Sequence, residues 1–268
     1  CFMVFWCVWW KVVERSHILV AFDAGKTTFR TEMYADYKGG RAKTPDEFRE
    51  QFPFIRELWA HLGIRHYELA QYEADDIIGT LGCLAEKDSF DVTIVSGDKD
   101  LIQLTDEHTV VEISKKGVAE FEAFTPDYLM EKMGLTPAQF IDLKALMGDK
   151  SDNIPGVTKI GEKIGIKLLL EHGSLEGIYE NIDGMKASKM KENLINDKEQ
   201  AFLSKTLATI ETQAPIEIGL DDLVYNGPDV ENLGKFYDEM GFKQLKQALN
   251  VSSADVAERL NFTIADPY

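Results

Sequence analysis

Cysteine and proline are scarce in this sequence. Its 268 residues include 3 cysteines, Cys1, Cys7 and Cys83, and no two of them form a C-x-x-C pair. A disulfide framework and a thiolate zinc site are therefore excluded, and a cytoplasmic location is expected. With 8 prolines and 44% hydrophobic residues, the composition also excludes collagen-like and disordered chains. The sequence predicts a globular protein with one large domain or two smaller ones.

Basic charge is also in short supply. The chain has 46 acidic and 29 basic residues and a formal net charge of −17. The overall charge therefore argues against a protein that coats nucleic acid. A polyanion would have to bind at local basic segments. One such segment runs from Lys26 to Lys43, where five basic residues outnumber two acidic ones and Tyr34 and Tyr37 are interspersed. This mixture is typical of single-strand binding, although a solvated surface is the ordinary alternative.

The only long, nearly uncharged run lies at residues 1–13, where Lys11 is the single charge. It is shorter than the roughly 20 residues of a membrane-spanning helix and lacks a signal-peptide cleavage site. No membrane association is therefore expected. Because the chain begins with Cys, we expect it to be a fragment.

From residue 17 onward, short β-rich runs alternate with helical patterns, which predicts an α/β fold with a parallel sheet. Hydrophobic spacing predicts strands at 17–22 and 92–95 and helices at 46–62 and 72–85. A Thr-Pro pair at 125–126 and another at 136–137 predict the starts of two further helices.

The pattern changes after Asp149, where Pro155-Gly156 and Gly161 predict a hairpin followed by a helix to about His172. Helical patterns continue at 187–210 and 229–249. The expected organisation is an atypical apolar segment, an α/β core, a helical subdomain and a linker, at residues 1–16, 17–150, 151–249 and 250–268.

Acidic residues gather at four places where predicted strands end or helices begin. They are Asp23, Glu73, Asp75, Asp76, Asp98, Asp100, Asp149 and Asp152. Ligands of parallel sheets bind beyond the carboxyl ends of the strands, so we expect these side chains to converge. Convergent carboxylates repel unless a hard cation neutralises them, and oxygen-only ligands favour Mg²⁺ or Mn²⁺. Two such ions support phosphodiester hydrolysis, although each acidic group also has ordinary uses in turns and helix starts.

A second basic segment covers the predicted hairpin and the helix that follows it, residues 156–163. Its glycines and the helix N-terminus can direct backbone N–H groups toward a phosphate. Lys159, Lys163 and Lys167 share one helical face. The candidate DNA contacts from both basic segments are Lys26, Arg30, Tyr37, Lys38, Arg41, Gly156, Val157, Lys159, Gly161 and Lys163.

Five motifs, in this order and spacing, resemble the 5′-nuclease domain of bacterial DNA polymerase I, within the flap endonuclease superfamily. They are FDAGKTTFR (22–30), YKGGR (37–41), YEADD (72–76), SGDKDLIQL (96–104) and GDKSDNIPGVTKIGEK (148–163). The resemblance covers residues 17–249. It implies a PIN-like α/β nuclease with a helix-hairpin-helix subdomain, in which the eight acids hold two divalent cations.

The same resemblance implies 5′-3′ exonucleolysis and 5′-flap cleavage in DNA replication and repair. The DNA partner would carry a 5′ flap, a nick or a single-strand/duplex junction, and proofreading and polymerase domains would follow in the same chain. Tyr37, Lys38 and Arg41 are similar to part of the family's helical arch, with Lys38 and Arg41 as catalytic residues. The hairpin at 156–161 resembles a duplex grip that uses a monovalent cation.

The sequence departs from this pattern at its start, where the family has a strand that ends in a metal-binding Asp. Residues 1–16 contain no Asp, and Glu14 is their only acid. We therefore expect residues 1–13 to lie outside the family pattern and one metal ligand to be missing. Two alternatives stay open: a catalytically impaired, structure-specific DNA-binding module, and an RNA-cleaving nuclease of the PIN type, which the hairpin disfavours.

Overall fold

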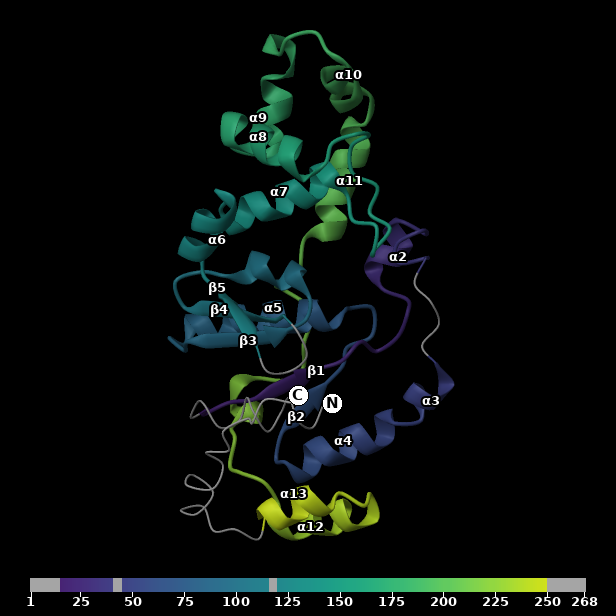
Figure 1. Cartoon of the computed structure of the whole chain (residues 1–268), viewed down its shortest axis with the longest axis vertical. Coiled ribbons are helices and arrows are strands. Elements are labelled where there is room, and N and C mark those ends of the chain that lie inside the picture. The colour runs from purple at the N-terminus through teal and green to yellow at the C-terminus, as the bar shows by residue number, and fades with distance from the viewer. Residues whose placement is uncertain (1–14, 41–44, 116–119, 250–268) are drawn as a thin grey trace, which may run out of the picture. The chain divides into compact units, whose positions relative to one another are not determined.

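The computed structural model describes residues 15–40, 45–115 and 120–249 (Figure 1). The chain divides into two compact units, each built from separate stretches of sequence. In the described part of the chain, the first unit comprises 21–40, 68–115 and 120–220, and the second comprises 15–20, 45–67 and 221–249. The domain boundary expected at 150/151 lies inside the first unit.

A three-stranded sheet lies in the first unit. It contains, in spatial order, β3 (Val92–Ser96), β4 (Thr109–Ser114) and β5 (Phe121–Phe124). β3 and β4 are parallel, with Val92 opposite Thr109, and β4 and β5 are antiparallel, with Val111 opposite Phe124. The α/β fold with a parallel strand pair is thus confirmed, and β4 and the antiparallel β5 are strands that the sequence analysis did not predict.

Helices that come before, within and after this sheet in sequence complete its core. They are α5 (Ala74–Lys87), the 3₁₀ helix η1 (Lys99–Leu104), α6 (Pro126–Met133) and α7 (Pro137–Met147). Buried Ile94, Leu101 and Val111 belong to one apolar cluster, to which α6 and α7 contribute Leu129 and Phe140. The predicted starts of α6 and α7 are confirmed, because the hydroxyls of Thr125 and Thr136 accept the amides of Tyr128 and Gln139.

The rest of the first unit is helical. It contains α2 (Phe29–Met33), α8 (Glu162–His172), α9 (Leu175–Glu180), the 3₁₀ helix η2 (Ile182–Gly184), α10 (Lys189–Asn196) and α11 (Lys198–Ala208). The hairpin before α8 crosses the end of α7 so closely that a Cβ at Gly156 would lie 2.2 Å from the Gly148 nitrogen. Both glycines also have positive φ, so this crossing requires glycine at each position.

Short elements build the second unit: β1 (Leu19–Ala21), α3 (Asp46–Arg49), α4 (Phe52–His61), β2 (Arg65–Tyr67), η3 (Leu220–Leu223), α12 (Val230–Glu239) and α13 (Lys243–Leu249), with β1 and η3 at the unit border. β1 pairs with β2, and α4 packs against β2 and α12. The stretches predicted as helices at 46–62, 187–210 and 229–249 each form two helices. None of the described helices combines the length and apolar character needed to cross a lipid bilayer.

Candidate functional site

The first unit brings predicted acids to the start of α5 and the end of β3. Glu73 is the N-cap of α5, and Asp75 lies in its first turn. Asp23 reaches the same turn, since its Oδ1 accepts the Ala74 amide at 2.8 Å. Asp98 follows β3 and caps η1 by accepting the Asp100 amide at 2.9 Å. Asp23, Glu73, Asp75 and Asp98 are named the Asp75 cluster below.

The pKa of the Asp75 carboxyl reflects the acids around it. Burial, followed by the negative charges of Asp98, Glu73 and Asp23, raises the pKa of Asp75 to about 7, although Lys38 opposes the shift. Like charges within electrostatic reach are the second cause after desolvation. The Asp75 cluster is therefore a site where a cation would relieve repulsion.

Lys38 lies between two of the predicted acids. Its Nζ is 2.6 Å from Oε1 of Glu73 and 3.8 Å from Oδ2 of Asp152, and its amide donates to the Asp152 carbonyl at 2.8 Å. Lys38 adopts a φ of 54°, which is uncommon for a residue with a side chain. The backbone and side-chain contacts thus hold one ammonium against the edge of the acidic site.

Tyr37, next to Lys38, points inward. Its side chain is 4% exposed, and its hydroxyl donates to Oε2 of Glu73 at 3.1 Å. Burial and the negative charge of Glu73 raise its pKa. Tyr37 is therefore turned away from solvent and orients Glu73, and its contact with DNA stays a prediction.

Lys144 on α7 joins Asp100 and Asp149. Its Nζ lies 2.5 Å from a carboxylate oxygen of each. Burial opposes ionisation of Asp149, but Lys144 and Ser151 lower its pKa to about 2. Burial raises the pKa of Asp100 despite Lys144. Sequence reasoning missed Lys144, and its only signal is a basic residue in the last turn of a helix.

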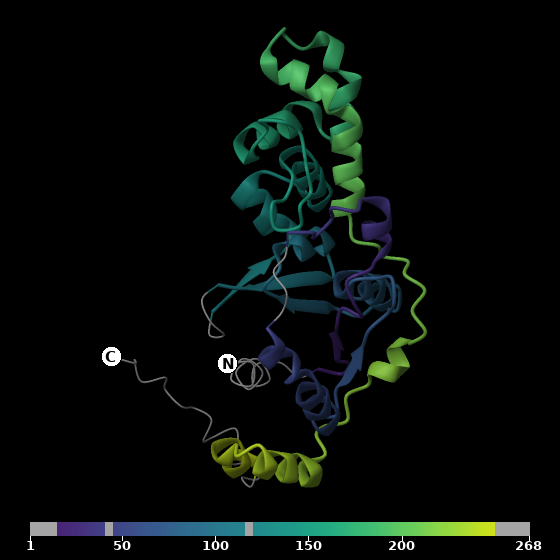
Figure 2. The same ribbon diagram turned by 90° about the vertical axis from the view of Figure 1, so that its right-hand side faces the viewer.

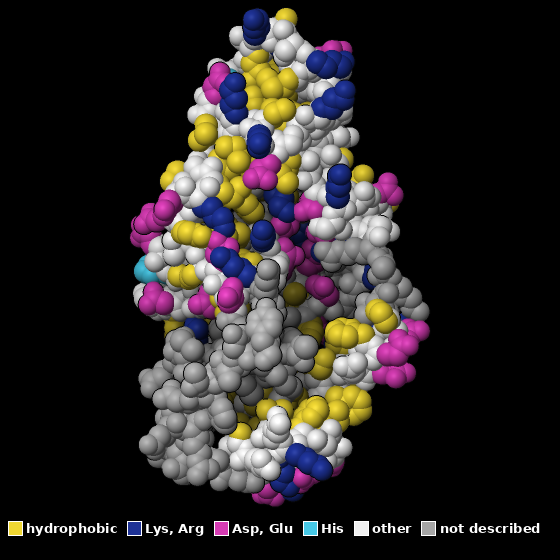
Figure 3. Space-filling view, viewed as in Figure 1, with side chains coloured by type: hydrophobic (Ala, Val, Ile, Leu, Met, Phe, Trp, Pro, Cys, Tyr) yellow, Lys and Arg dark blue, Asp and Glu magenta, His cyan; other side chains and the backbone are white. Residues whose placement is uncertain are grey.

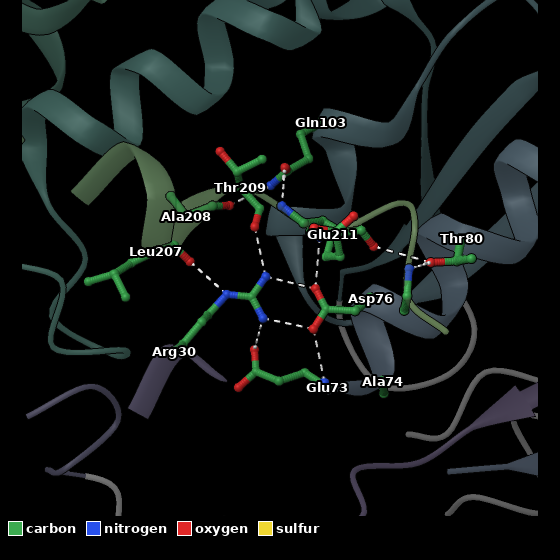
Figure 4. A network of polar contacts seen from close by, with 12 residues as sticks. Arg30, Glu73, Ala74, Asp76, Thr80, Gln103, Leu207, Ala208, Thr209 and Glu211 are labelled. Carbon is green, nitrogen blue, oxygen red and sulfur yellow. Dashed lines mark hydrogen bonds and ion pairs between the residues drawn. The ribbon is translucent and has the colours of Figure 1, made fainter. Parts of the chain in front are cut away.

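Arg30 and Asp76 form a buried ion pair next to Glu73 (Figure 4). Nη1 and Nη2 of Arg30 donate to the two Asp76 oxygens at 2.8 and 2.7 Å, and Arg30 is 2% and Asp76 0% exposed. The Asp76 oxygens also accept the amides of Glu73 and Glu211. Arg30 is thus buried and both Asp76 oxygens are bonded within the protein, so the roles predicted for them in DNA and metal binding would need these bonds to open and stay predictions.

Only some of the predicted DNA contacts at the hairpin before α8 are exposed. Lys159, Gly161 and Lys163 are exposed, as is Lys26 in the loop after β1. Gly156 and Val157 are buried, and their amides donate to Ser204 Oγ at 3.0 Å and to the Leu146 carbonyl at 2.7 Å. The amides of Gly156 and Val157 are therefore already paired within the protein, and the contact of these two residues with DNA stays a prediction.

Arg41 lies outside the described residues, as do residues 1–13. On the face shown in Figure 3, Lys and Arg side chains occur at intervals over the helical part of the first unit, between hydrophobic side chains. Positive charge is thus available on this part despite the acidic composition of the chain.

The acids suit a hard cation in kind, because every donor is an oxygen. Across residues 15–40, 45–115 and 120–249, no group of three or more His, Cys, Asp or Glu side chains is gathered closely enough to hold one ion. Instead, Lys38 and Lys144 lie against four of the carboxylates. Side-chain rotation would be needed before these acids could share a metal.

Comparison with known proteins gives two adjoining family matches. A 5′-3′ exonuclease N-terminal resolvase-like domain matches residues 2–134, and a 5′-3′ exonuclease C-terminal SAM fold matches residues 135–231. The first match begins at residue 2, so the expectation that residues 1–13 lie outside the family pattern is wrong.

Among relatives, DNA polymerase I of Streptococcus pneumoniae (strain ATCC BAA-255 / R6) is 91% identical over 254 residues, which are 95% of this chain and 29% of that protein. The chain therefore spans less than a third of that relative. A solved T5 5′-exonuclease with bound divalent metal ions is 26% identical, covers 82% of each chain and has a TM-score of 0.64. A bacteriophage T5 flap endonuclease complex with DNA and metal ions is 22% identical, covers 90% of this chain and 84% of that chain, has a TM-score of 0.62, and shows a shared fold.

Proposed function

This chain belongs to the 5′-3′ exonuclease family, and from that premise we propose that it hydrolyses DNA phosphodiester bonds at 5′ ends and 5′ flaps. The observation that carries the proposal is the Asp75 cluster, four acids brought together beside Lys38. Family membership favours the nuclease over the non-catalytic alternative. The relatives named DNA polymerase I support a role in replication and repair, with proofreading and polymerase domains in the same protein.

Two divalent cations, Mg²⁺ or Mn²⁺, are part of this proposal. When bound, they would activate a water molecule and stabilise the leaving oxygen. The Asp75 cluster would hold one ion, and Asp100, Asp149 and Asp152 would contribute to a second. Asp23 and Asp98 are exposed, so their side chains have room to turn toward an ion.

Lys38 and Arg41 would act on the scissile phosphate. The Lys38 ammonium stands between Glu73 and Asp152, at the border of the two proposed groups of ligands. Neutralising those acids with metal would free the ammonium to pair with a phosphate oxygen. Arg41 would also pair with a phosphate oxygen, a role that rests on its place in the YKGGR motif alone.

DNA with a 5′ flap, a nick or a single-strand/duplex junction is the proposed partner. Exposed Lys26, Lys159 and Lys163 would contact phosphates, together with the Gly161 amide at the start of α8. The carbonyls of Gly156 and Thr158 already accept side-chain amides. A monovalent cation at the hairpin would therefore use the remaining carbonyls. The three cysteines favour a cytoplasmic site of action.

The test is cleavage of a 5′-labelled flap substrate with Mg²⁺ or Mn²⁺, with a chelator as the blank. The chain should cleave at the junction, and Asp75→Asn should abolish cleavage. Asp127→Asn is the matched control, because Asp127 is an exposed acid in the first turn of α6. Tight DNA binding without cation-dependent cleavage would contradict the proposal.

A further inference from the structure

We propose that α11 is a positioning strut that fixes the hairpin at 156–161, together with Asp149 and Asp152, relative to the acids carried by α5 and η1. The inference rests on the proposed function, because it treats the hairpin as the duplex grip. All the parts involved lie in the first unit. The residues of the strut are positioning residues and lie on neither the metal nor the scissile phosphate.

One end of the strut holds the backbone of the hairpin. Ser204 Oγ accepts the Gly156 amide at 3.0 Å, and Gln200 Nε2 donates to the Gly156 carbonyl at 2.6 Å. Asp197 and Asn193 bond the amide and the carbonyl of Thr158 at 2.8 and 2.9 Å. Both polar groups of two hairpin residues are therefore held by side chains from the α10–α11 segment.

Three of these side chains belong to α11 and its N-cap. Asp197, Gln200 and Ser204 are spaced three and four residues apart, which places them on one face of α11, and Asn193 adds a fourth contact from α10. Ser204 is 0% exposed. Water therefore cannot easily replace its bond to the Gly156 amide, and the hairpin conformation depends on the helix.

The other end of the strut is held by the parts that carry the acids. Arg30 Nε donates to the Leu207 carbonyl at 3.0 Å, and Nη2 donates to the Thr209 carbonyl at 2.7 Å. Gln103 Nε2 donates to the Ala208 carbonyl at 3.0 Å, and its Oε1 accepts the Ile210 amide at 2.9 Å. The last carbonyls of a helix have no partners within the helix, so these side chains satisfy them and fix the end of α11.

The positions of these anchors link the strut to the chemistry. Gln103 belongs to η1, which also carries Asp100 and is capped by Asp98. Arg30 binds Asp76, three residues after Glu73 on α5. Figure 2 shows α11 running from α10 toward α2, and α11 packs along α7, which ends just before Asp149. A shift of α11 would therefore change the separation between the duplex grip and the acids of α5 and η1.

Two variants test this, one at each end of the strut. Gln103→Met keeps the side-chain length and removes both bonds to the end of α11, and Ser204→Ala removes the acceptor of the Gly156 amide. Thr206→Ala is the matched control, since Thr206 is an exposed α11 residue whose hydroxyl bonds its own helix. The readout is the position of the cut in a 5′-labelled flap, mapped to the nucleotide, beside the Kd for the uncut junction.

Loss of either anchor should spread cleavage over neighbouring phosphates, while the parent chain and Thr206→Ala cut at one position. Ser204→Ala should also weaken junction binding by about tenfold. A purely stabilising role would lower the active fraction without moving the cut. A single unchanged cleavage position in both variants would overturn the inference.

A measurement without DNA separates this inference from the proposed function. Spin labels at exposed Lys99→Cys and Lys167→Cys, with the native cysteines replaced by serine, report the distance between η1 and α8. The distance distribution should be narrow in the parent chain and broader with Gln103→Met. Equal widths would overturn the strut even if the chain cleaves flaps, and a chain that cuts no flap would refute only the proposed function.

Discussion

Asp75 and Asp76 are adjacent in the first turn of α5, yet they belong to two different electrostatic regions. Asp76 is fully buried and paired bidentately with Arg30, and backbone amides also reach its oxygens. Asp75 lies among Asp23, Glu73 and Asp98, and its pKa is raised to about 7. Donors of the protein satisfy both Asp76 oxygens, whereas burial and neighbouring negative charges disfavour the ionised form of Asp75. Two acidic residues of one motif can therefore differ in role, one within the scaffold and one at the candidate site.

The largest expected effect on stability comes from removing Arg30, the partner of buried Asp76. Arg30→Met should lower the free energy of unfolding by about 3–5 kcal/mol, because Asp76 would remain buried without its partner. Urea unfolding measures the loss. The double variant Arg30→Met/Asp76→Leu should recover part of it, since it removes the stranded charge. A single variant as stable as the parent would contradict the structural role of the pair.

The next effect is the gain in stability on metal binding, which should depend on Asp75. The parent chain should gain about 2.7 kcal/mol of stability when Mn²⁺ is at a hundredfold excess over its Kd. Asp75→Asn should lose most of that gain, whereas Asp127→Asn should retain it. Thermal unfolding with and without Mn²⁺ measures both. A melting temperature that does not respond to Mn²⁺ in the folded parent chain would contradict the metal assignment.

A smaller effect is expected at exposed Lys159 and Lys163, which lie in the hairpin and at the start of α8. Lys159→Ala with Lys163→Ala should weaken duplex binding by about tenfold and lower the salt slope by about 2. Binding should be measured by fluorescence anisotropy at several salt concentrations. Lys235→Ala with Lys243→Ala removes the same charge from α12 and α13 and serves as the control. If both pairs weaken binding equally, the hairpin has no special role.

The last effect is the pH dependence of stability that Asp75 gives in the absence of metal. Its pKa is raised in the folded chain from an ordinary 3.8 to about 7. The folded state thus holds this proton more tightly than the unfolded state, so stability from this group falls as pH rises from about 4 to about 7. Asp75→Asn should remove that fall. Unfolding curves of both proteins across this pH window test it, and identical slopes would contradict the shift.

Local sequence patterns determined much of the fold. Thr125 and Thr136 predicted the starts of α6 and α7, and hydrophobic spacing predicted α5 and β3. The motifs also led to the 5′-3′ exonuclease family. The helix starts and the periodic elements depend on residues within one or two turns of each other, which is the range that hydrophobic spacing reports. The breaks at 50–51 and at Asp197 were missed because apolar spacing continues across them.

Only the tertiary structure decided which polar residues are available for chemistry. Arg30 bonds the carbonyls of Leu207 and Thr209, which are 177 and 179 residues away in sequence. The same kind of distant contact buries Tyr37 against Glu73 and seals the Gly156 amide with Ser204. Local pattern does not encode such partners, because the charge and size of a side chain are the same whether it faces water or a buried ion. Burial and pairing, set by the assembled fold, separate Asp76 as scaffold from Asp75 as the proposed centre of the site.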